Sequence, residues 1–231
     1  RRRLGLERSL AEATVRAVAQ LVLAGWALTL LLDGDTPMVW AWAWVVAMVP
    51  AAGDAARRRE PRLAGLGWMT AVGASLGLGV SLATVFALGI LPLEARVLVP
   101  VSGMVVGNSL KVVVVAATRL VDGLRDRVGE VEALLALGFR PAWAVRDVAS
   151  DALRLALLPQ IETTRSVGVV FLPGALTGLI LAGVDPIQAA LVQAALLFLI
   201  LGTAAVTGLV VVFFGVRVFL TDDQRLVPPT V

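Results

Sequence analysis

The chain has 231 residues, of which 58% are hydrophobic and 16% are charged, and its mean hydropathy is +0.89. A typical soluble domain is about 45–50% apolar and about 25% charged, so this composition excludes a soluble domain. The formal net charge of +3 comes from short basic clusters between apolar runs, a pattern that orients membrane proteins and argues against a nucleic-acid partner.

Apolar segments recur along the chain, and about 20 residues of helix are needed to cross roughly 30 Å of hydrocarbon. The candidate spans, in chain order, are residues 10–32, 38–53, 63–91, 97–118, 153–182 and 187–216. A turn is expected between the first two, at 33–37. The sequence therefore predicts an all-α polytopic membrane protein, a single permease domain over residues 1–231 with about six transmembrane helices.

Basic residues are distributed unequally between the two sides of these spans. With the N-terminus in the cytoplasm, almost all arginines of the connecting segments fall on the cytoplasmic side, and only Arg96 falls on the other. Cytoplasmic loops of membrane proteins are enriched in lysine and arginine. We therefore expect a multi-pass protein of the inner (plasma) membrane, in contact with the lipid bilayer and with residues 119–151 in the cytoplasm.

Residues 119–151 form the one polar segment large enough for a role of its own. Two short helices are expected around Gly138 and Pro141, with an amphipathic stripe on the first. The spacing of the acidic, small and glycine residues in 132–138 resembles that of the coupling loop of ABC permeases. The candidate ATPase-coupling residues are Glu132, Ala133, Leu135, Gly138 and Arg140. Such a helix can seat in a cleft of a soluble ATPase, whereas the alternative is an ordinary interfacial helix.

Several residues place polar, soft or irregular groups within apolar segments. The candidates for a translocation path are Ser102, Met104, Asn108, Glu162, Arg165, Pro173 and Gly174. Glu162 and Arg165 share a helix face and should pair or face water, as a structural clasp or as part of the path. Pro173 and Gly174 predict a kink or break, whose free carbonyls could coordinate a cation; the alternative is a packing kink. Lys111, alone in the fourth span, is a charged residue of the same kind as Glu162 and Arg165 and could be structural or part of the path.

Glycines recur at four-residue spacing in three pairs, Gly73 with Gly77, Gly103 with Gly107, and Gly174 with Gly178. This spacing lets two helix backbones approach closely in lipid. The pairs therefore indicate helix packing and carry little information about function.

Some chemistry is excluded by what the sequence lacks. The chain has no cysteine and no histidine, which excludes disulfides, thiol chemistry and imidazole catalysis. It has no GxxxxGK[ST] phosphate-binding loop, and its one lysine is Lys111. We expect no catalytic residue and no cofactor in this chain, with ATP and magnesium on a separate partner subunit. Ligands for a metal cannot be assigned.

Four segments together resemble the iron-export ABC permease family, the Fet-type permeases of bacteria, whose plant relatives are aluminium-tolerance half-transporters. These segments are residues 100–109, 132–138, 154–159 and 162–186. The resemblance extends over about residues 4–220. It departs from the family at Ala175 and Leu176, where members often carry methionines, and at Lys111, where they carry a polar or small residue.

The resemblance implies an ATP-dependent exporter of iron or another metal cation, built from two permeases and two soluble ABC ATPases. It also implies one further span before Arg1, hence seven in the intact protein, which agrees with the absence of an initiator methionine. The rival interpretations are a secondary transporter that works without an ATPase, a non-transporting scaffold or membrane enzyme, and ABC export of a different cargo such as a sugar nucleotide.

Overall fold

The computed structural model describes residues 7–31, 37–221 and 225–227. The helices, in chain order, are α1 (Glu7–Leu31), α2 (Met38–Arg59), α3 (Leu66–Ala87), α4 (Ala95–Asp126), α5 (Val128–Ala136), α6 (Pro141–Ala144), α7 (Arg146–Ser166), α8 (Gly174–Leu181) and α9 (Pro186–Val218). Within these described residues no strand forms beyond two isolated bridges. The predicted all-α class is confirmed. Arg1, Arg2, Arg3 and the part of the expected turn at 33–36 lie outside the described residues.

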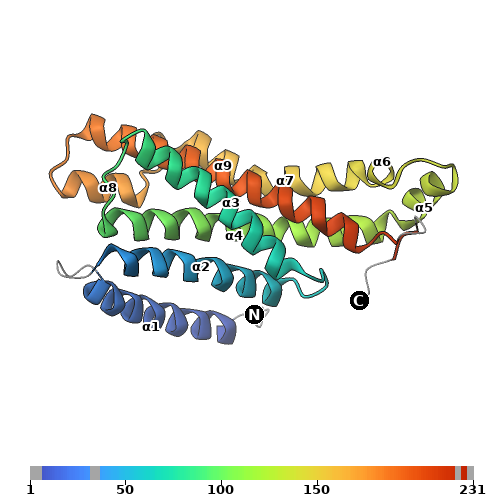
Figure 1. Ribbon diagram of the computed structural model, residues 1–231, viewed down its shortest axis with the longest axis horizontal. Helices are drawn as coiled ribbons and strands as arrows, with labels where there is room; N and C mark the ends of the chain where they lie inside the picture. The colour runs from blue at the N-terminus through green and yellow to red at the C-terminus, as the bar shows by residue number, and fades with distance from the viewer. Residues whose placement is uncertain (1–6, 32–36, 222–224, 228–231) are drawn as a thin grey trace, which may run out of the picture.

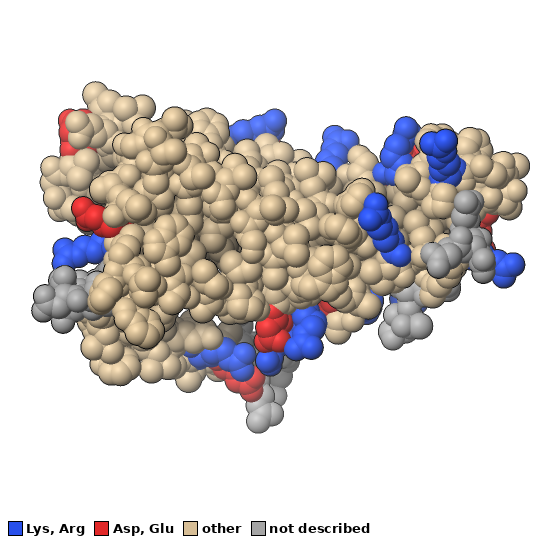
Figure 2. All heavy atoms as spheres, viewed as in Figure 1, with Lys and Arg blue, Asp and Glu red and all other residues tan. Residues whose placement is uncertain are grey.

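The long helices lie side by side along the long axis of the molecule, with α5 and α6 at one end and α8 at the other (Figure 1). Figure 2 shows a broad surface with few charges over the left and centre of the view, while most visible basic side chains lie toward the end that carries α5 and α6. We call this end, toward which α2 and α9 also run, the basic end. The end with α8 and the first turns of α4 and α9 is the opposite end.

Five helices within the described residues are long and apolar enough to cross a membrane: α1 from Ala11, α2, α3, α4 and α9. The predicted span at 153–182 is not a single helix, because it is divided into α7 and α8. Helix α7 is also unusually polar for a span, and its charged residues are Arg146, Asp147, Asp151, Arg154, Glu162 and Arg165. The polytopic architecture is therefore as predicted, with one of its six apolar segments interrupted.

Two helices continue beyond the spans predicted for them. Helix α2 does not stop near residue 53 but ends at Arg59, because Asp54 pairs with Arg57 and Arg58 on the same helix face at 2.8 and 2.6 Å. Helix α4 does not stop at 118 but continues to Asp126, since Leu120, Val121 and Leu124 remain buried against its neighbours. An apolar segment therefore predicts the part of a helix that spans the membrane, but it does not predict the residue at which the helix ends.

The interior is built where α3 and α4 pack against α9. A Cβ atom at Gly73 would lie 2.9 Å from Cα of Thr207, and one at Gly77 would lie 2.6 Å from Cγ2 of Thr203. Hydroxyl groups tie the same helices together, because the hydroxyls of Ser81 and Thr203 lie 2.6 Å apart. The first glycine pair therefore provides the close helix contact that its spacing predicts.

The other two glycine pairs make no such contact. No atom lies within 4 Å of a Cβ built at Gly107, Gly174 or Gly178, and the nearest to one at Gly103 is the methyl carbon of Met48, at 3.7 Å. The four-residue spacing alone therefore does not distinguish a packed face from an open one.

Candidate functional site

The segment at residues 127–145, which we call the coupling element, consists of α5, α6 and their connections at the basic end. Val131 of α5 is 1% exposed, and Ala144 and Val145 are buried in the same apolar cluster as Leu120 and Leu124 of α4. These contacts fix the coupling element to the extended end of α4. A force applied to it is therefore transmitted to a long helix.

The outer surface of the coupling element carries both charge and apolar groups. Glu132 and Ala133 are exposed, as are the side chains of Leu137, at 75%, and Phe139, at 40%. Leu135, predicted as a coupling residue, is instead half-buried and packs against the core. The ring of Phe139 stacks on that of Trp143 with centroids 4.4 Å apart. The exposed apolar anchors are thus Leu137 and Phe139, neither of which was among the predicted coupling residues.

Gly138 ends α5 in a left-handed conformation, with φ of 84°. Its N–H donates to the carbonyl of Leu135 at 3.0 Å, and the N–H of Phe139 donates to the carbonyl of Leu134 at 3.1 Å. This is the Schellman arrangement, in which a glycine reverses the chain and satisfies the last carbonyls of a helix. Arg140 follows in extended backbone as the residue before α6.

A break in the chain direction separates α7 from α8 near the opposite end. Helix α7 ends at Ser166, and the chain turns through Gly168, whose φ is 82°. The N–H of Gly168 donates to the carbonyl of Phe171 at 3.0 Å, and that of Val170 donates to the carbonyl of Ser166 at 3.0 Å. The helix is therefore interrupted and not merely kinked.

Pro173 precedes α8, and Gly174 is its first residue. The N–H of Leu176, in the first turn of α8, donates to Oε1 of the buried Gln193 of α9 at 3.2 Å. Gln193 thus satisfies a helix-terminal donor and holds α8 against α9. Its position in an apolar segment, five residues after Gln188, was the only signal for this role in the sequence.

Glu162 and Arg165 form an ion pair of 2.8 Å on the last turns of α7. They line a groove of about 500 Å³ together with Pro159, Thr163, Ser166, Val169 and Val170. The hydroxyls of Thr163 and Ser166 donate to carbonyls one turn back, those of Pro159 and Glu162. The groove combines a carboxylate, a guanidinium and two hydroxyls beside the break, and both charged side chains are exposed.

The path candidates on α4 have other surroundings. Ser102 is fully buried, and its hydroxyl oxygen has no hydrogen-bond partner among the described residues. Met104 is half-buried in the apolar core, and the side-chain amide of Asn108 donates to its carbonyl at 2.8 Å. The Lys111 ammonium donates to the Asn108 amide oxygen at 3.4 Å. Within the described part of the chain, no hydrogen bond or ion pair joins these residues to Glu162 or Arg165.

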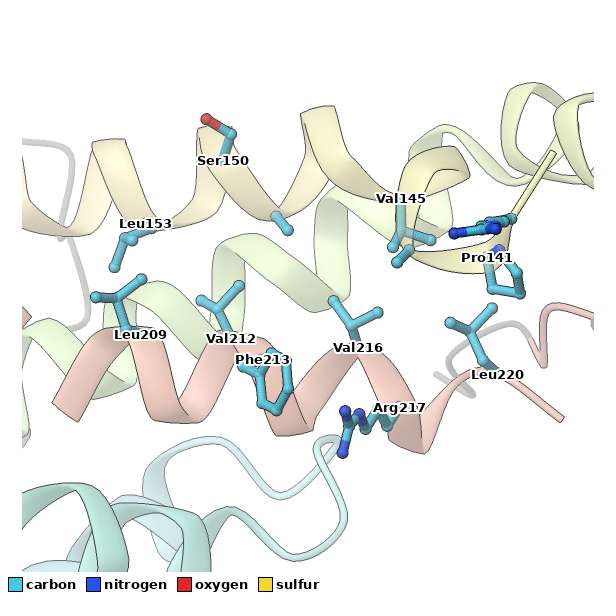
Figure 3. A pocket seen from close by; sticks show the side chains of 13 residues that line it. Pro141, Val145, Ser150, Leu153, Leu209, Val212, Phe213, Val216, Arg217 and Leu220 are labelled. Atoms are coloured by element: carbon cyan, nitrogen blue, oxygen red, sulfur yellow. The ribbon is translucent and has the colours of Figure 1, made fainter. Parts of the chain in front are cut away.

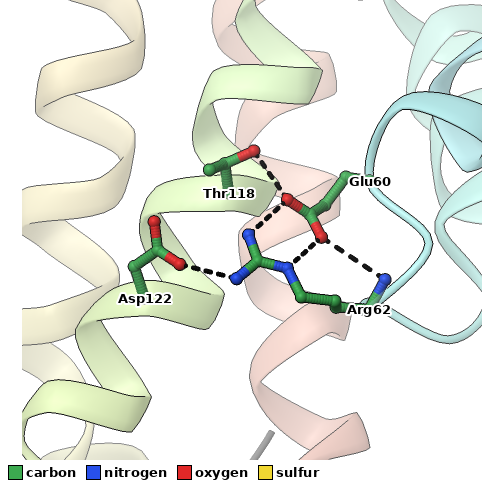
Figure 4. Close-up of polar contacts among 4 residues, drawn as sticks. All are labelled: Glu60, Arg62, Thr118 and Asp122. Atoms are coloured by element: carbon green, nitrogen blue, oxygen red, sulfur yellow. Dashed lines mark hydrogen bonds and ion pairs between the residues drawn. The ribbon is translucent and has the colours of Figure 1, made fainter. Parts of the chain in front are cut away.

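A polar cluster at the basic end joins the α2–α3 connection to α4 (Figure 4). Arg62 donates through Nε and Nη2 to both carboxylate oxygens of Glu60, at 2.8 Å each, and through Nη1 to Asp122 at 2.8 Å. The hydroxyl of Thr118 donates to Glu60 at 2.8 Å. We call Glu60, Arg62, Thr118 and Asp122 the Glu60 cluster. None of these four residues was predicted from the sequence to be part of a site.

Hydrogen bonds determine the charge state of the Glu60 cluster. The guanidinium of Arg62, and then the hydroxyl of Thr118, lower the pKa of Glu60 below its usual value, and they outweigh the opposing effect of burial. The two carboxylates, Glu60 first, raise the pKa of Arg62 above its usual value. Both groups are therefore ionised at neutral pH, although Glu60 is only 3% exposed.

The residues that the structure describes hold no group of three or more Asp, Glu, His or Cys side chains that could bind a metal ion. Oxygen atoms near the break come instead from one carboxylate, hydroxyls and the backbone.

The model of a family described as "Uncharacterised protein family (UPF0014)" matches residues 1–220. The chain belongs to this family. Among UPF0014 relatives, it is 32% identical over 222 residues to the membrane protein YjkA of Bacillus subtilis (strain 168), covering 96% of this chain and 88% of YjkA. No solved structure matches the chain.

Two other relatives carry more informative names. The chain is 27% identical over 225 residues to the "Probable iron export permease protein FetB" of Escherichia coli (strain K12), covering 97% of this chain and 86% of FetB. It is 27% identical over 227 residues to "Protein ALUMINUM SENSITIVE 3" of Arabidopsis thaliana, covering 96% of this chain and 81% of that protein. The resemblance to Fet-type permeases and their plant relatives is therefore confirmed. The prediction of a multi-pass membrane protein is confirmed as well.

Proposed function

We propose that this UPF0014 member is the membrane-spanning permease subunit of an ATP-binding-cassette exporter, moving iron or another metal cation out of the cytoplasm. The observation that carries the proposal is the coupling element, whose inner face is packed on α4 while its outer face exposes Leu137 and Phe139 beside Glu132. A helix–turn with exposed apolar anchors fits a cleft on a soluble partner. The name of FetB supports the direction and the cargo.

In this mechanism two copies of the chain pair in the membrane, and each coupling element binds one ATPase subunit, which holds ATP and magnesium. Closure of the ATPases moves the coupling elements, and the packed helices rock between inward- and outward-open states. The path candidates are the groove of Glu162 and Arg165, the break before Gly174, and the polar residues of α4.

The test is reconstitution of the full chain with its cognate ABC ATPase in proteoliposomes. Iron(II) salts should stimulate ATP hydrolysis and metal transport, and the variant Glu132→Lys should lower this stimulation at least about tenfold by reversing a charge on the outer face of α5, a change in coupling of about 1.4 kcal/mol. Transport driven by an ion gradient without nucleotide, or stimulation by a sugar nucleotide and not by metals, would contradict the proposal.

A further inference from the structure

A groove of about 610 Å³ runs between α7 and α9 and reaches α6, away from the outer face of α5 and from the break (Figure 3). We call it the α7–α9 groove. Side chains of Leu153 on α7 and of Leu209 and Val212 on α9 point toward one another across it. Its volume lies within the range of about 300–1,000 Å³ that is typical of small-ligand sites.

The α7–α9 groove is apolar along most of its length and open to the surroundings. The apolar side chains that line it include Leu153, Leu209, Val212, Phe213, Val216 and Leu220. Two of these remain largely uncovered, because Leu209 is 54% exposed and Phe213 is 56% exposed. An acyl chain would fit this surface and pack against it through van der Waals contacts.

The position of the groove across the bilayer follows from the length of α9. This helix has 33 residues and is therefore about 50 Å long, more than the roughly 40–45 Å of a whole bilayer with its headgroups. The helix starts at the opposite end, so its last three turns, which line the groove, reach the headgroup region on the side of the basic end. The groove thus begins within the hydrocarbon of that leaflet and ends at its surface.

Two arginines, Arg140 and Arg217, lie in the lining, and no carboxylate does. Within the described part of the chain neither guanidinium has an ion pair or a hydrogen-bond acceptor, whereas Arg62, Arg127 and Arg165 all do. Arg217 is held by aromatic rings instead, with its guanidinium carbon 4.1 Å from the centre of Phe213. Stacking of this kind leaves the N–H donors of a guanidinium free for an anion.

We propose that the α7–α9 groove binds an anionic phospholipid of the inner leaflet. One acyl chain occupies the apolar part between Leu153 and Val212, and the positive charges of Arg140 and Arg217 attract the headgroup phosphate to the basic end of the groove. Unpaired arginines beside an apolar groove are complementary to a ligand that has an apolar chain and one anionic head. Arg140 also belongs to the coupling element, but the lipid binding proposed here requires neither ATP nor the ATPase.

The experiment measures lipid binding to the purified full chain by native mass spectrometry, with phosphatidylglycerol and phosphatidylcholine added in equal amounts. We expect a preference for phosphatidylglycerol that falls about fivefold with each arginine removed, hence about 25-fold in Arg140→Gln/Arg217→Gln. The double lysine variant keeps the charges and should retain most of the preference. Arg59→Gln, which removes an exposed arginine of the same end outside the groove, is the matched control and should leave it unchanged.

A second variant tests the apolar part of the groove. Leu209→Trp fills the space between α7 and α9 and should reduce phosphatidylglycerol binding with both arginines intact, provided that the thermal midpoint shows a folded protein. Equal binding of the two lipids to the wild type, or an unchanged preference in the double glutamine variant, would overturn the proposal. The proposal would also be overturned if the double glutamine variant lost its dimer but kept its lipid, since the groove would then be an interface between copies.

Discussion

Glu60 keeps its charge in a buried position because its carboxylate accepts hydrogen bonds from Arg62 and Thr118. A buried carboxylate without such partners would become protonated. Arg62 in turn reaches Asp122 on α4, so a single side chain ties the α2–α3 connection to the helix that carries the coupling element. The Glu60 cluster is therefore expected to stabilise the basic end of the bundle.

We expect Glu60→Gln to lower the free energy of unfolding by about 1–3 kcal/mol at pH 7, because it weakens charge-assisted hydrogen bonds in a buried position. The folded-state pKa of Glu60 is lowered, so its stabilisation is complete above the ordinary pKa, 4.5, and is lost as the pH falls through the lower folded-state value. The measurement is the thermal midpoint in detergent from pH 7 to pH 3.5.

The gap between wild type and Glu60→Gln should narrow below about pH 4.5, the ordinary pKa of the group. Asp147→Asn is a suitable control, since Asp147 is an exposed carboxylate at the same end, paired only with its neighbour Arg146. A gap that stays constant over the whole pH range would contradict the role of the Glu60 charge.

Individual residues show where sequence patterns stop being informative. Leu135 and Leu137 are both leucines of the amphipathic stripe, yet Leu135 packs inward and Leu137 is exposed. The last residue of α5, Ala136, lies between them, so the period of 3.6 residues no longer decides which side chain is buried. Glu60 and Gln193 depend on partners about 60 and 17 residues away, Thr118 and Leu176, and no local pattern predicts such pairs.

At the level of helices, the contact between α3 and α9 depends on Gly73 and Gly77, where added methyl groups would meet Thr207 and Thr203. At Gly73 the nearest atom is Cα of Thr207, so the helices themselves must move apart to make room. Gly79, on the same helix, faces open space. The two glycines thus offer a matched comparison.

We expect Gly73→Ala to destabilise the protein by about 1–2 kcal/mol. Overpacking costs about 1–3 kcal/mol, and the higher helix propensity of alanine offsets up to about 1 kcal/mol of this cost. Gly79→Ala gains propensity without a clash and should be neutral or stabilising. Thermal midpoints of both variants in the same detergent check this difference. If Gly73→Ala proved as stable as Gly79→Ala, α3 and α9 would not be in close contact.

The helical elements were partly predictable from their sequences. Pro173 and Gly174 correctly indicate an interruption, because proline removes a donor and glycine loosens the helix. The start of that interruption, already at Val167, was not predicted, since residues 167–172 remain apolar and differ from a span only through Gly168 in its left-handed conformation. Likewise, the continuation of α4 depends on packing against α7 and α9, which apolarity does not report.

For the whole molecule, the unequal distribution of basic residues predicts that the coupling element lies in the cytoplasm. The chain has no natural cysteine, so single cysteines can report this orientation directly. In sealed right-side-out vesicles, Glu94→Cys at the opposite end should react with a membrane-impermeant maleimide. Ala136→Cys, on the exposed surface of α5, should react only after permeabilisation.

Ala51→Cys, on an exposed position within α2, controls for reagent access to the membrane-spanning region and should stay unlabelled in both conditions. Labelling of Ala136→Cys from outside would place the coupling element on the wrong side for a cytoplasmic ATPase and would exclude the proposed mechanism.

Helix α4 is continuous, and it can therefore move as a rigid lever, which we call the arm. Its 32 residues extend over about 48 Å, from the opposite end to the coupling element. A tilt of about 5° about one end would carry the other through about 4 Å, a geometric consequence of that length. A displacement of this size, delivered by a motor at α5, would therefore reorient the arm as one body, and no separate hinge inside the bilayer would be required.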